Sequence, residues 1–173
     1  CDYNSAEQSV EVVHRPETGT PIKNAEPGER FVALSGDVCQ LLDDWIETQR
    51  PDVTDEYGRK PLVTTPAGRV HKSTLRGDCY RFTRPCVVNN GCPHNRDLMN
   101  CSATEYEGAS ECPSSVSPHA LRRGGITHAL SQDWPMKSVG DRANVSEEVL
   151  ELHYDQRSGR EKMEQRRRYL ENL

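Results

Sequence analysis

Two short stretches of alternating apolar and polar residues lie near the start of the chain. They occupy Val10–Val13 and, less regularly, Phe31–Leu34. The residues between them are rich in proline and glycine and include Lys23. Alternation on both sides of turn-forming residues is typical of antiparallel strands. We therefore predict two strands joined by a long hairpin loop that carries Lys23.

A helical pattern begins directly after the second predicted strand. Apolar residues recur from Val38 to Ile46 at spacings of three and four, which places them on one face of a helix. Ser35 and Asp37 can cap the start of this helix, and Pro51 ends it. It is the most regular helical pattern in the chain.

Helical patterns dominate the rest of the sequence. The further helices that we predict are Ser73–Pro85, Pro118–Ser131, Met136–Ala143, a helix from Ser146 past Tyr154, and a charged tail helix at Arg160–Leu173. The sequence therefore predicts an α+β fold that is mainly α. The length favours a single domain over residues 1–173.

The overall composition is that of a polar globular protein. Hydrophobic residues make up 34% of the chain, and no apolar run is long enough for a transmembrane helix. The start of the chain lacks the pattern of a signal peptide, so we expect a cytoplasmic protein that does not contact a membrane. Because the chain begins with Cys1 and not with Met, we expect a fragment of a longer protein.

The net charge of −5 argues only weakly against a nucleic-acid partner. The basic residues are seventeen arginines and five lysines, and much of the acid lies in other segments. An acidic surface with few lysines is also typical of proteins from a high-salt cytoplasm. A halophilic archaeal source is therefore compatible with the composition.

Residues 86–117, called here the cysteine segment, differ in composition from the rest. They contain hardly any aliphatic residues, so they cannot bury enough apolar surface to order themselves. A structural Zn²⁺ could order such a loop in a reducing compartment. The ligands that we predict are Cys86, Cys92, Cys101 and Cys112, with His94 as a substitute for one of them. No Cys-x-x-Cys pair is present, so free thiols in a variable insertion remain the alternative.

The candidate chemistry lies in the last third of the chain. His119 and Arg122 are one helical turn apart, and Tyr154 follows about thirty residues later. A tyrosine that attacks a phosphodiester needs fixed cations around the phosphate, and the planar fork of an arginine can bond two phosphate oxygens. A histidine on the same helix face can add a donor or act on a proton. Each residue alone is unremarkable, but their order and spacing predict strand transfer through a phosphotyrosine.

Three segments resemble those of a known family. Ser117–Leu130, which reads Ser-Pro-His-Ala-Leu-Arg-Arg-Gly-Gly-Ile-Thr-His-Ala-Leu, resembles the central box of the tyrosine recombinases of the Xer and phage integrase type. Pro21–Leu34 is similar to the family's β-hairpin, and Val139–Tyr154 is similar to the closing box that ends in the nucleophile. Integrases of halophilic archaea look similar in carrying a cysteine-bearing insert before the central box.

The resemblance implies a truncated catalytic domain over residues 1–173, with the cysteine segment as an insertion. Its fold would be mainly α-helical, with a small antiparallel β-hairpin or sheet at one edge. Its function would be site-specific DNA recombination or integration on double-stranded DNA, carried out by copies of the chain that assemble on DNA. Such a protein would be associated with the nucleoid.

The resemblance also implies a role for each candidate residue. Tyr154 would attack the scissile phosphate to give a 3′-phosphotyrosyl link, and Lys23 would protonate the leaving 5′ oxygen. Arg122 and His119 would hold the phosphate in the transition state. A second DNA strand would then displace the tyrosine, so catalysis needs no metal and no cofactor.

The chain departs from the family pattern near several of these residues. The family's first catalytic arginine would fall before Cys1, so we expect it to be absent from this sequence. Asn144 aligns with a family histidine or tryptophan and could donate a hydrogen bond, and Arg142 is the alternative if the alignment shifts. Arg123 replaces the second histidine of the central box.

DNA contacts and an alternative function complete the sequence-based expectations. We expect Lys72, Arg123 and Arg142 to contact DNA, mainly at phosphates. The alternative function is a catalytically inactive, zinc-ordered DNA-binding or interaction module on the recombinase fold.

Overall fold

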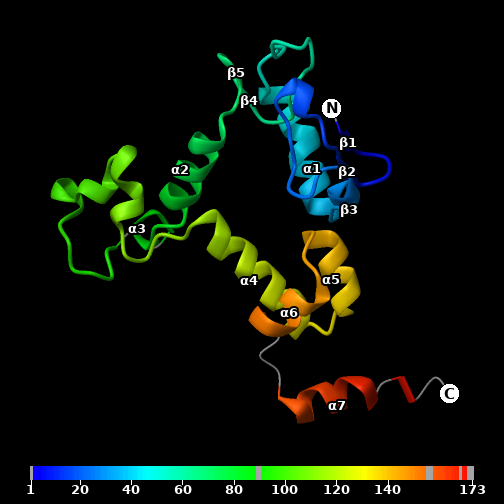
Figure 1. The fold of residues 1–173 in the computed structure, drawn as a ribbon. Helices are drawn as coiled ribbons and strands as arrows, with labels where there is room; N and C mark the ends of the chain where they lie inside the picture. Colours follow the sequence, from blue (N-terminus) through cyan, green and yellow to red (C-terminus); the bar gives the residue numbers. More distant parts are fainter. Residues whose placement is uncertain (1, 89–90, 155–157, 168, 171–173) are drawn as a thin grey trace. The chain divides into compact units, whose positions relative to one another are not determined.

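The structure is a computed structural model that describes residues 2–88, 91–154, 158–167 and 169–170, without the side chain of residue 165. The chain forms two compact units, residues 1–117 and 118–173, and each is described by itself (Figure 1). Within the described ranges, no helix combines the length and the apolar character needed to cross a membrane.

A small antiparallel sheet begins the first unit. It consists of β1 (Tyr3–Asn4), β2 (Ser9–Val12) and β3 (Arg30–Ala33) in the order β1-β2-β3. Val10 pairs with Val32, so the predicted antiparallel pairing of the two alternating stretches is confirmed. The two-residue strand β1 was not predicted, because two residues carry no periodic signal.

The helix predicted after the hairpin is present. On its predicted apolar face Leu42, Trp45 and Ile46 are half-buried, whereas Val38 and Leu41 are exposed. α1 (Gly36–Asp44) continues as a π-helix (Trp45–Gln49), which ends just before Pro51, the predicted stop. Cys39 is 4% exposed, whereas Leu41 is 68% exposed. The Tyr3 hydroxyl lies 3.1 Å from the Cys39 carbonyl, and this polar contact with β1 accompanies the burial of the Cys39 side.

A second hairpin and a second helix follow. β4 (Thr64–Thr65) and β5 (Gly68–Arg69) pair antiparallel, and α2 (Lys72–Phe82) begins one residue before its predicted start. The helix is capped by His71, whose Nδ1 accepts a hydrogen bond from the Ser73 backbone N–H at 3.2 Å. Histidine is not one of the residue types that usually cap helices, so the sequence predicted a start at Ser73.

The cysteine segment folds into short turns that pack against α2. The turns are α3 (Pro85–Val88), η4 (Leu98–Asn100), η5 (Ser102–Thr104) and η6 (Glu107–Glu111). Arg84 is 6% exposed and donates a hydrogen bond to the Ala103 carbonyl. The Val116 backbone N–H donates to the Thr83 hydroxyl at 2.8 Å. Hydrogen bonds with the residues directly after α2 therefore hold the middle and the end of this polar segment.

The second unit is helical and has its own hydrophobic core. Its helices are α4 (Pro118–Ser131), α5 (Met136–Ala143), α6 (Glu147–His153) and α7 (Gly159–Arg167). The core is formed by α4, α5 and α6 and contains Ile126, Leu130, Val139 and Leu150. Figure 1 shows these helices packed together.

The predicted helix bounds are confirmed closely in this unit. α4 and α5 match their predicted bounds at both ends. α6 ends at His153, so Tyr154 caps the helix and does not lie inside it, while residues 155–157 of the predicted helix lie outside the described residues. α7 covers most of the predicted tail helix, of which residues 168 and 171–173 lie outside the description.

Candidate active site

His119 and Arg122 extend the core-facing stripe of α4 toward the start of the helix. The spacing from His119 through Arg122 and Ile126 to Leu130 is three, four and four residues, which defines one helix face. Ile126 and Leu130 are buried on this face, whereas His119 and Arg122 are exposed. The same periodicity that builds the core therefore brings two polar side chains to its solvent-accessible edge.

Arg122 is held against the end of α5. Its Nη2 donates a hydrogen bond to the backbone carbonyl of Ala143, the last residue of that helix. The carbonyl end of a helix carries partial negative charge and favours a cation. A guanidinium has five N–H donors, so one bond to a carbonyl leaves others for a bound anion. The contact therefore holds the arginine in place and leaves further N–H donors on its guanidinium.

The end of α5 is shaped by a tight turn. Asn144 adopts the left-handed conformation, with φ 50° and ψ 59°, and the Val145 backbone N–H donates to the Gly140 carbonyl at 3.0 Å. Asparagine tolerates this conformation better than most residues with a side chain. A Cβ at Gly140 would lie 2.7 Å from the Val145 carbonyl oxygen, so the close approach needs glycine. Asn144 thereby follows directly on the carbonyl that Arg122 binds.

Tyr154 is positioned by the end of α6. Its backbone N–H donates to the Leu150 carbonyl at 3.0 Å, and Leu150 is fully buried. The tyrosine is half-buried, and its side chain packs against the core of the second unit. A packing tyrosine would show the same burial, so the position alone does not assign the nucleophile.

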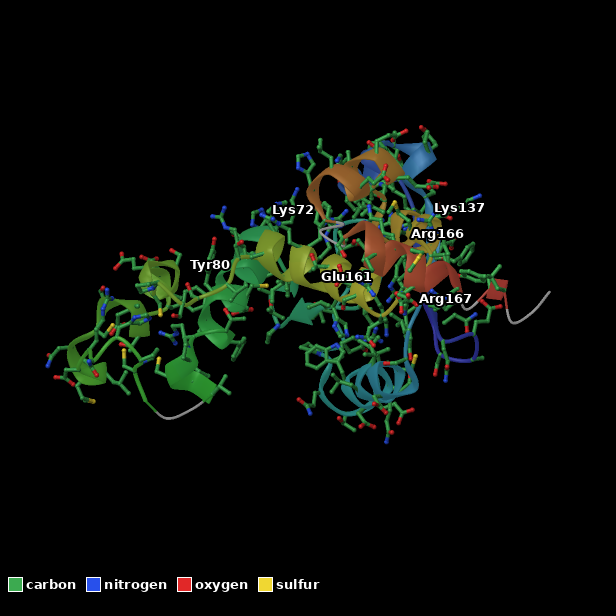
Figure 2. The ribbon with its side chains drawn as sticks, turned by 90° about the horizontal axis from the view of Figure 1, so that it is seen from below. Lys72, Tyr80, Lys137, Glu161, Arg166 and Arg167 are labelled. Carbon is green, nitrogen blue, oxygen red and sulfur yellow. The ribbon has the colours of Figure 1, made fainter. Side chains whose placement is uncertain are left out.

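The predicted lysines belong to the first unit. Lys23 is exposed in the loop between β2 and β3, in a turn where the Ala25 backbone N–H donates to the Ile22 carbonyl at 3.3 Å. Asn24 has a φ of 73°, as the third residue of a type II turn requires. Lys72 is exposed at the start of α2, where it is labelled in Figure 2.

The other predicted DNA contacts lie on the surface of the second unit. Arg123 is exposed on α4, and Arg142 is exposed in the last turn of α5. A basic residue in the last turn of a helix also interacts favourably with the helix dipole, whatever its role in binding. Their DNA contacts remain predictions.

The charge is unevenly divided along the chain. Residues 118–173 contain ten basic residues (Lys and Arg) and nine acidic residues (Asp and Glu). Residues 1–117 contain twelve basic and eighteen acidic residues. The segment 57–96 alone has eight basic residues and one acidic residue. The net negative charge therefore comes mainly from the first 56 residues, and it does not exclude an anionic partner elsewhere.

The geometry does not fit the predicted zinc site. In the part of the chain that the structure describes, no group of three or more His, Cys, Asp or Glu side chains could hold a metal ion. Cys86, Cys92, Cys101 and Cys112 are free, half-buried thiols. The Nε2 atom of His94 instead lies 2.9 Å from the Ser114 hydroxyl oxygen. Zinc binding stays a prediction from the sequence, without support from these positions.

The chain is similar in structure to a solved recombinase. Aligned with the crystal structure of XerA recombinase, it is 15% identical with a TM-score of 0.54, and the match covers 97% of this chain and 48% of that one. The fold is recombinase-like. The chain spans about half the length of the recombinase that it matches. The sequence matches no protein-family model and no curated protein.

One feature of the site was not predicted from the sequence. The Ala143 carbonyl, which binds Arg122, is a backbone group and has no sequence signal. The continuous stripe from His119 to Leu130, by contrast, can be read from the spacing alone. The recombinase-like fold brings Arg122, Asn144 and Tyr154 into one compact unit.

Proposed function

We propose that this chain cleaves and rejoins DNA through a covalent 3′-phosphotyrosyl link, as the catalytic domain of a site-specific tyrosine recombinase or integrase. The observation that carries the proposal is the second unit. It has His119 and Arg122 on the core-facing stripe of α4, Arg122 bonded to the end of α5, and Tyr154 at the end of α6. The recombinase-like fold supports the same function.

The proposed first step exchanges one ester for another. The Tyr154 phenol gives its proton to solvent as its oxygen bonds to phosphorus, and the bond from phosphorus to the 5′ oxygen breaks. Lys23 supplies a proton to that leaving oxygen. Arg122 stabilises the negative charge that builds on the phosphate oxygens, because its guanidinium stays charged throughout.

The remaining groups assist the same transition state. His119 adds a donor to the phosphate, and Asn144 supplies a side-chain amide in place of a histidine. A 5′ hydroxyl from a second strand then attacks phosphorus and gives its proton to Lys23. The bond from phosphorus to the tyrosine oxygen breaks, and that oxygen regains a proton from solvent. The phosphate ester energy is kept in the protein–DNA link, so the reaction consumes no nucleotide.

The proposed partner is double-stranded DNA, with further copies of the chain assembled on it. Lys72, Arg123 and Arg142 contact phosphates and so position the protein without reading the sequence. No observation on the described residues favours the alternative of an inactive, zinc-ordered module.

The proposal is tested by trapping the covalent intermediate. The protein is incubated with a library of nicked duplexes with randomised arms, in which loss of a short fragment after cleavage prevents religation. Denaturing gels then detect DNA that remains attached to protein. We expect an adduct for the wild type and for Tyr169→Phe, which alters an exposed tyrosine beyond α7, and none for Tyr154→Phe. An adduct that persists in Tyr154→Phe would exclude this nucleophile, and a wild type without adduct would exclude the reaction.

A further inference from the structure

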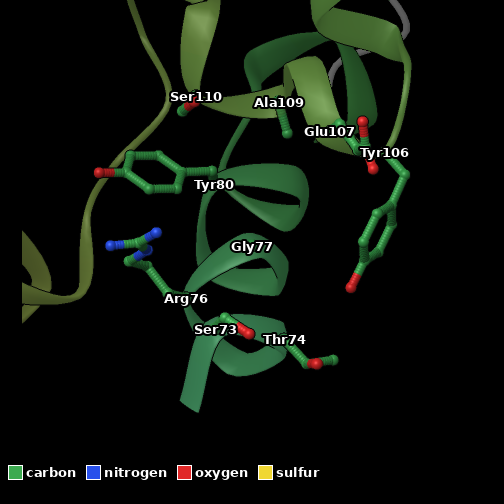
Figure 3. Close-up of a pocket in the computed structure, with 9 residues that line it drawn as sticks. All are labelled: Ser73, Thr74, Arg76, Gly77, Tyr80, Tyr106, Glu107, Ala109 and Ser110. Carbon is green, nitrogen blue, oxygen red and sulfur yellow. The ribbon is translucent and has the colours of Figure 1, made fainter. Parts of the chain in front are cut away.

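A second candidate site lies in the first unit, between α2 and the cysteine segment. It is a surface cavity with a volume of about 510 Å³ (Figure 3). Residues from both of its walls line the cavity, among them Ser73, Arg76, Gly77, Tyr80, Tyr106 and Glu107. None of them has been assigned a role in strand transfer.

One wall of the cavity is the side of α2 that carries Arg76 and Tyr80. These residues are four apart, so they lie on the same face of the helix, and Figure 3 shows the Arg76 guanidinium on the same side of the helix as the Tyr80 ring. Gly77 lies between them in sequence and leaves the helix surface bare. A Cβ at Gly77 would approach only the Tyr106 hydroxyl, at 3.9 Å.

The other wall is Tyr106, which is held by an arginine from α2. The Arg81 guanidinium lies over the Tyr106 ring, 5.3 Å from its centroid. The same guanidinium pairs with Asp78 at 3.1 Å. Such cation–π and ion-pair contacts keep an exposed aromatic ring in place. The cavity is thus built jointly by the helix and by the cysteine segment.

The chemistry of these walls matches that of a nucleotide. Aromatic faces stack on bases, a guanidinium binds phosphate, and a carboxylate such as that of Glu107 accepts hydrogen bonds from exocyclic amino groups. The cavity has the volume of a small-molecule site. One of its walls, α2, belongs to the segment 57–96, whose eight basic residues against one acidic residue attract a phosphate backbone.

We propose that this cavity binds one unstacked nucleotide of a DNA single strand. The base stacks on Tyr80, the phosphate binds Arg76, and Glu107 accepts a hydrogen bond from the base. The inference rests on the proposed function in taking DNA as the partner. It adds a site for a strand that is unpaired, which the chemistry at Tyr154 does not require.

The test measures the binding of a labelled single-stranded oligonucleotide and of its duplex by fluorescence anisotropy. Gly77→Leu fills the cavity, and Gly77→Ala is its matched control because a single methyl group fits. We expect Gly77→Leu to weaken single-strand binding about tenfold, as the loss of one stacked base does, and to leave duplex binding unchanged. Gly77→Ala is expected to bind like the wild type. Equal losses for both probes, or no loss for either, would overturn the proposal.

Further variants keep the test valid if Gly77→Leu does not fold. Tyr80→Leu should lose single-strand affinity, whereas Tyr80→Phe keeps the ring and should retain it. Arg76→Gln should lower the slope of single-strand affinity against salt concentration by the equivalent of about one phosphate contact. Lys60→Gln makes the same change in charge outside the cavity, so the ratio of single-strand to duplex affinity should stay that of the wild type. Single-strand affinity that Tyr80→Leu leaves unchanged would contradict the site.

Two controls separate the possible outcomes. A free deoxynucleoside monophosphate should displace the oligonucleotide only at a much higher concentration. Displacement at a concentration equal to that of the oligonucleotide would mean that the cavity binds free nucleotides, and it would overturn the proposal that the ligand is a DNA single strand. Adduct formation at Tyr154 is measured on the same preparations. Adducts without any effect of the cavity variants on binding would overturn this inference alone, and the expected binding effects without adducts would overturn the proposed strand transfer alone.

Discussion

The Arg122 guanidinium is bound to a backbone carbonyl and still has N–H donors for a further ligand. Its bond to the Ala143 carbonyl fixes the guanidinium at the edge of a hydrophobic core. A lysine could keep the charge but could not form a fork around two phosphate oxygens. The role proposed for Arg122 therefore depends on the shape of the group as well as on its charge.

We predict that Arg122→Lys slows adduct formation about 100-fold, because one oriented donor in a transition state contributes on that scale. The free energy of unfolding should change little, since the side chain is exposed. Arg123→Lys, on the next residue of α4, is the matched control and should stay within about threefold of the wild type in rate, as expected for a phosphate contact on the surface. Adduct formation at the wild-type rate in Arg122→Lys would contradict the assignment.

Asp55 illustrates a residue that supports the hairpin loop from a distance in sequence. Its carboxylate bonds Arg59 at 2.9 Å, and Arg59 also donates to the Thr18 carbonyl at 2.9 Å. Burial opposes ionisation of Asp55, but hydrogen bonds from Arg59 and from the Tyr57 backbone N–H prevail and hold its pKa below the ordinary value. The charged form therefore stabilises the loop that carries Lys23.

The stabilisation by Asp55 should depend on pH. Because the pKa is lower in the folded state, the contribution is complete above the unfolded pKa of about 3.9 and is lost as the pH falls through the folded pKa. We expect Asp55→Asn to unfold more easily than the wild type at pH 6, with a difference that shrinks steadily below about pH 4. Urea unfolding at a series of pH values measures this. A difference that is constant down to acid pH would contradict the lowered pKa.

At the scale of elements, the connection from α5 to α6 sets the position of the Arg122 anchor. Gly140 allows the Val145 carbonyl to approach the helix closely. We predict that Gly140→Ala destabilises the protein by about 1–3 kcal/mol through overpacking. Gly124→Ala, at an open position in α4, should instead stabilise it by about 0.5–1 kcal/mol. Urea unfolding distinguishes the two, and equal effects of both substitutions would contradict the close approach.

The cysteine segment is held by hydrogen bonds with the residues directly after α2. Arg84 donates to the Ala103 carbonyl, and removing it leaves that buried bond unmade. We predict that Arg84→Met lowers the free energy of unfolding by about 1–3 kcal/mol and speeds proteolysis within residues 86–117. If the cysteines are free thiols, a metal chelator leaves both measurements of the wild type unchanged. A large effect of the chelator would instead support the zinc site predicted from the sequence, with Cys101→Ser as the control.

The elements that could be predicted are those with long, regular patterns. α4 and α5 were predicted at both ends, because periodic apolar residues and proline mark them clearly. The burial of Cys39 on α1 could not be predicted, because the Tyr3 contact that accompanies it comes from a strand of two residues. The turns η4 to η6 depend on contacts distant in sequence, so local patterns do not reveal them.

At the scale of the whole molecule, charge and chemistry are distributed separately. The first 56 residues carry most of the excess acid, while the segment 57–96 is strongly basic and the second unit is nearly neutral. A net charge for the complete chain hides this pattern. An anionic polymer such as DNA would be attracted to the basic segment even though the protein as a whole is acidic.

The candidate site could be predicted from sequence only in part. Residue type and spacing placed His119 and Arg122 on one face of α4, because helical periodicity is local, and the catalytic roles of both residues and of Tyr154 stay predictions. The Ala143 carbonyl and the cavity beside Tyr80 required the fold, because each joins segments that are distant in sequence. Zinc binding by the cysteines stays a prediction, because cysteine spacing alone does not determine the path of a loop.

The central claim is that Tyr154 becomes covalently attached to DNA, and peptide mapping of the adduct tests it most directly. Trypsin cleaves after Arg142 and Arg157, which releases residues 143–157 with Tyr154 as their sole tyrosine. After reaction with nicked duplexes and nuclease digestion, we predict that this peptide gains the mass of a nucleotide joined through its 3′ phosphate. The nucleotide mass on a different peptide, or on none, would contradict the claim.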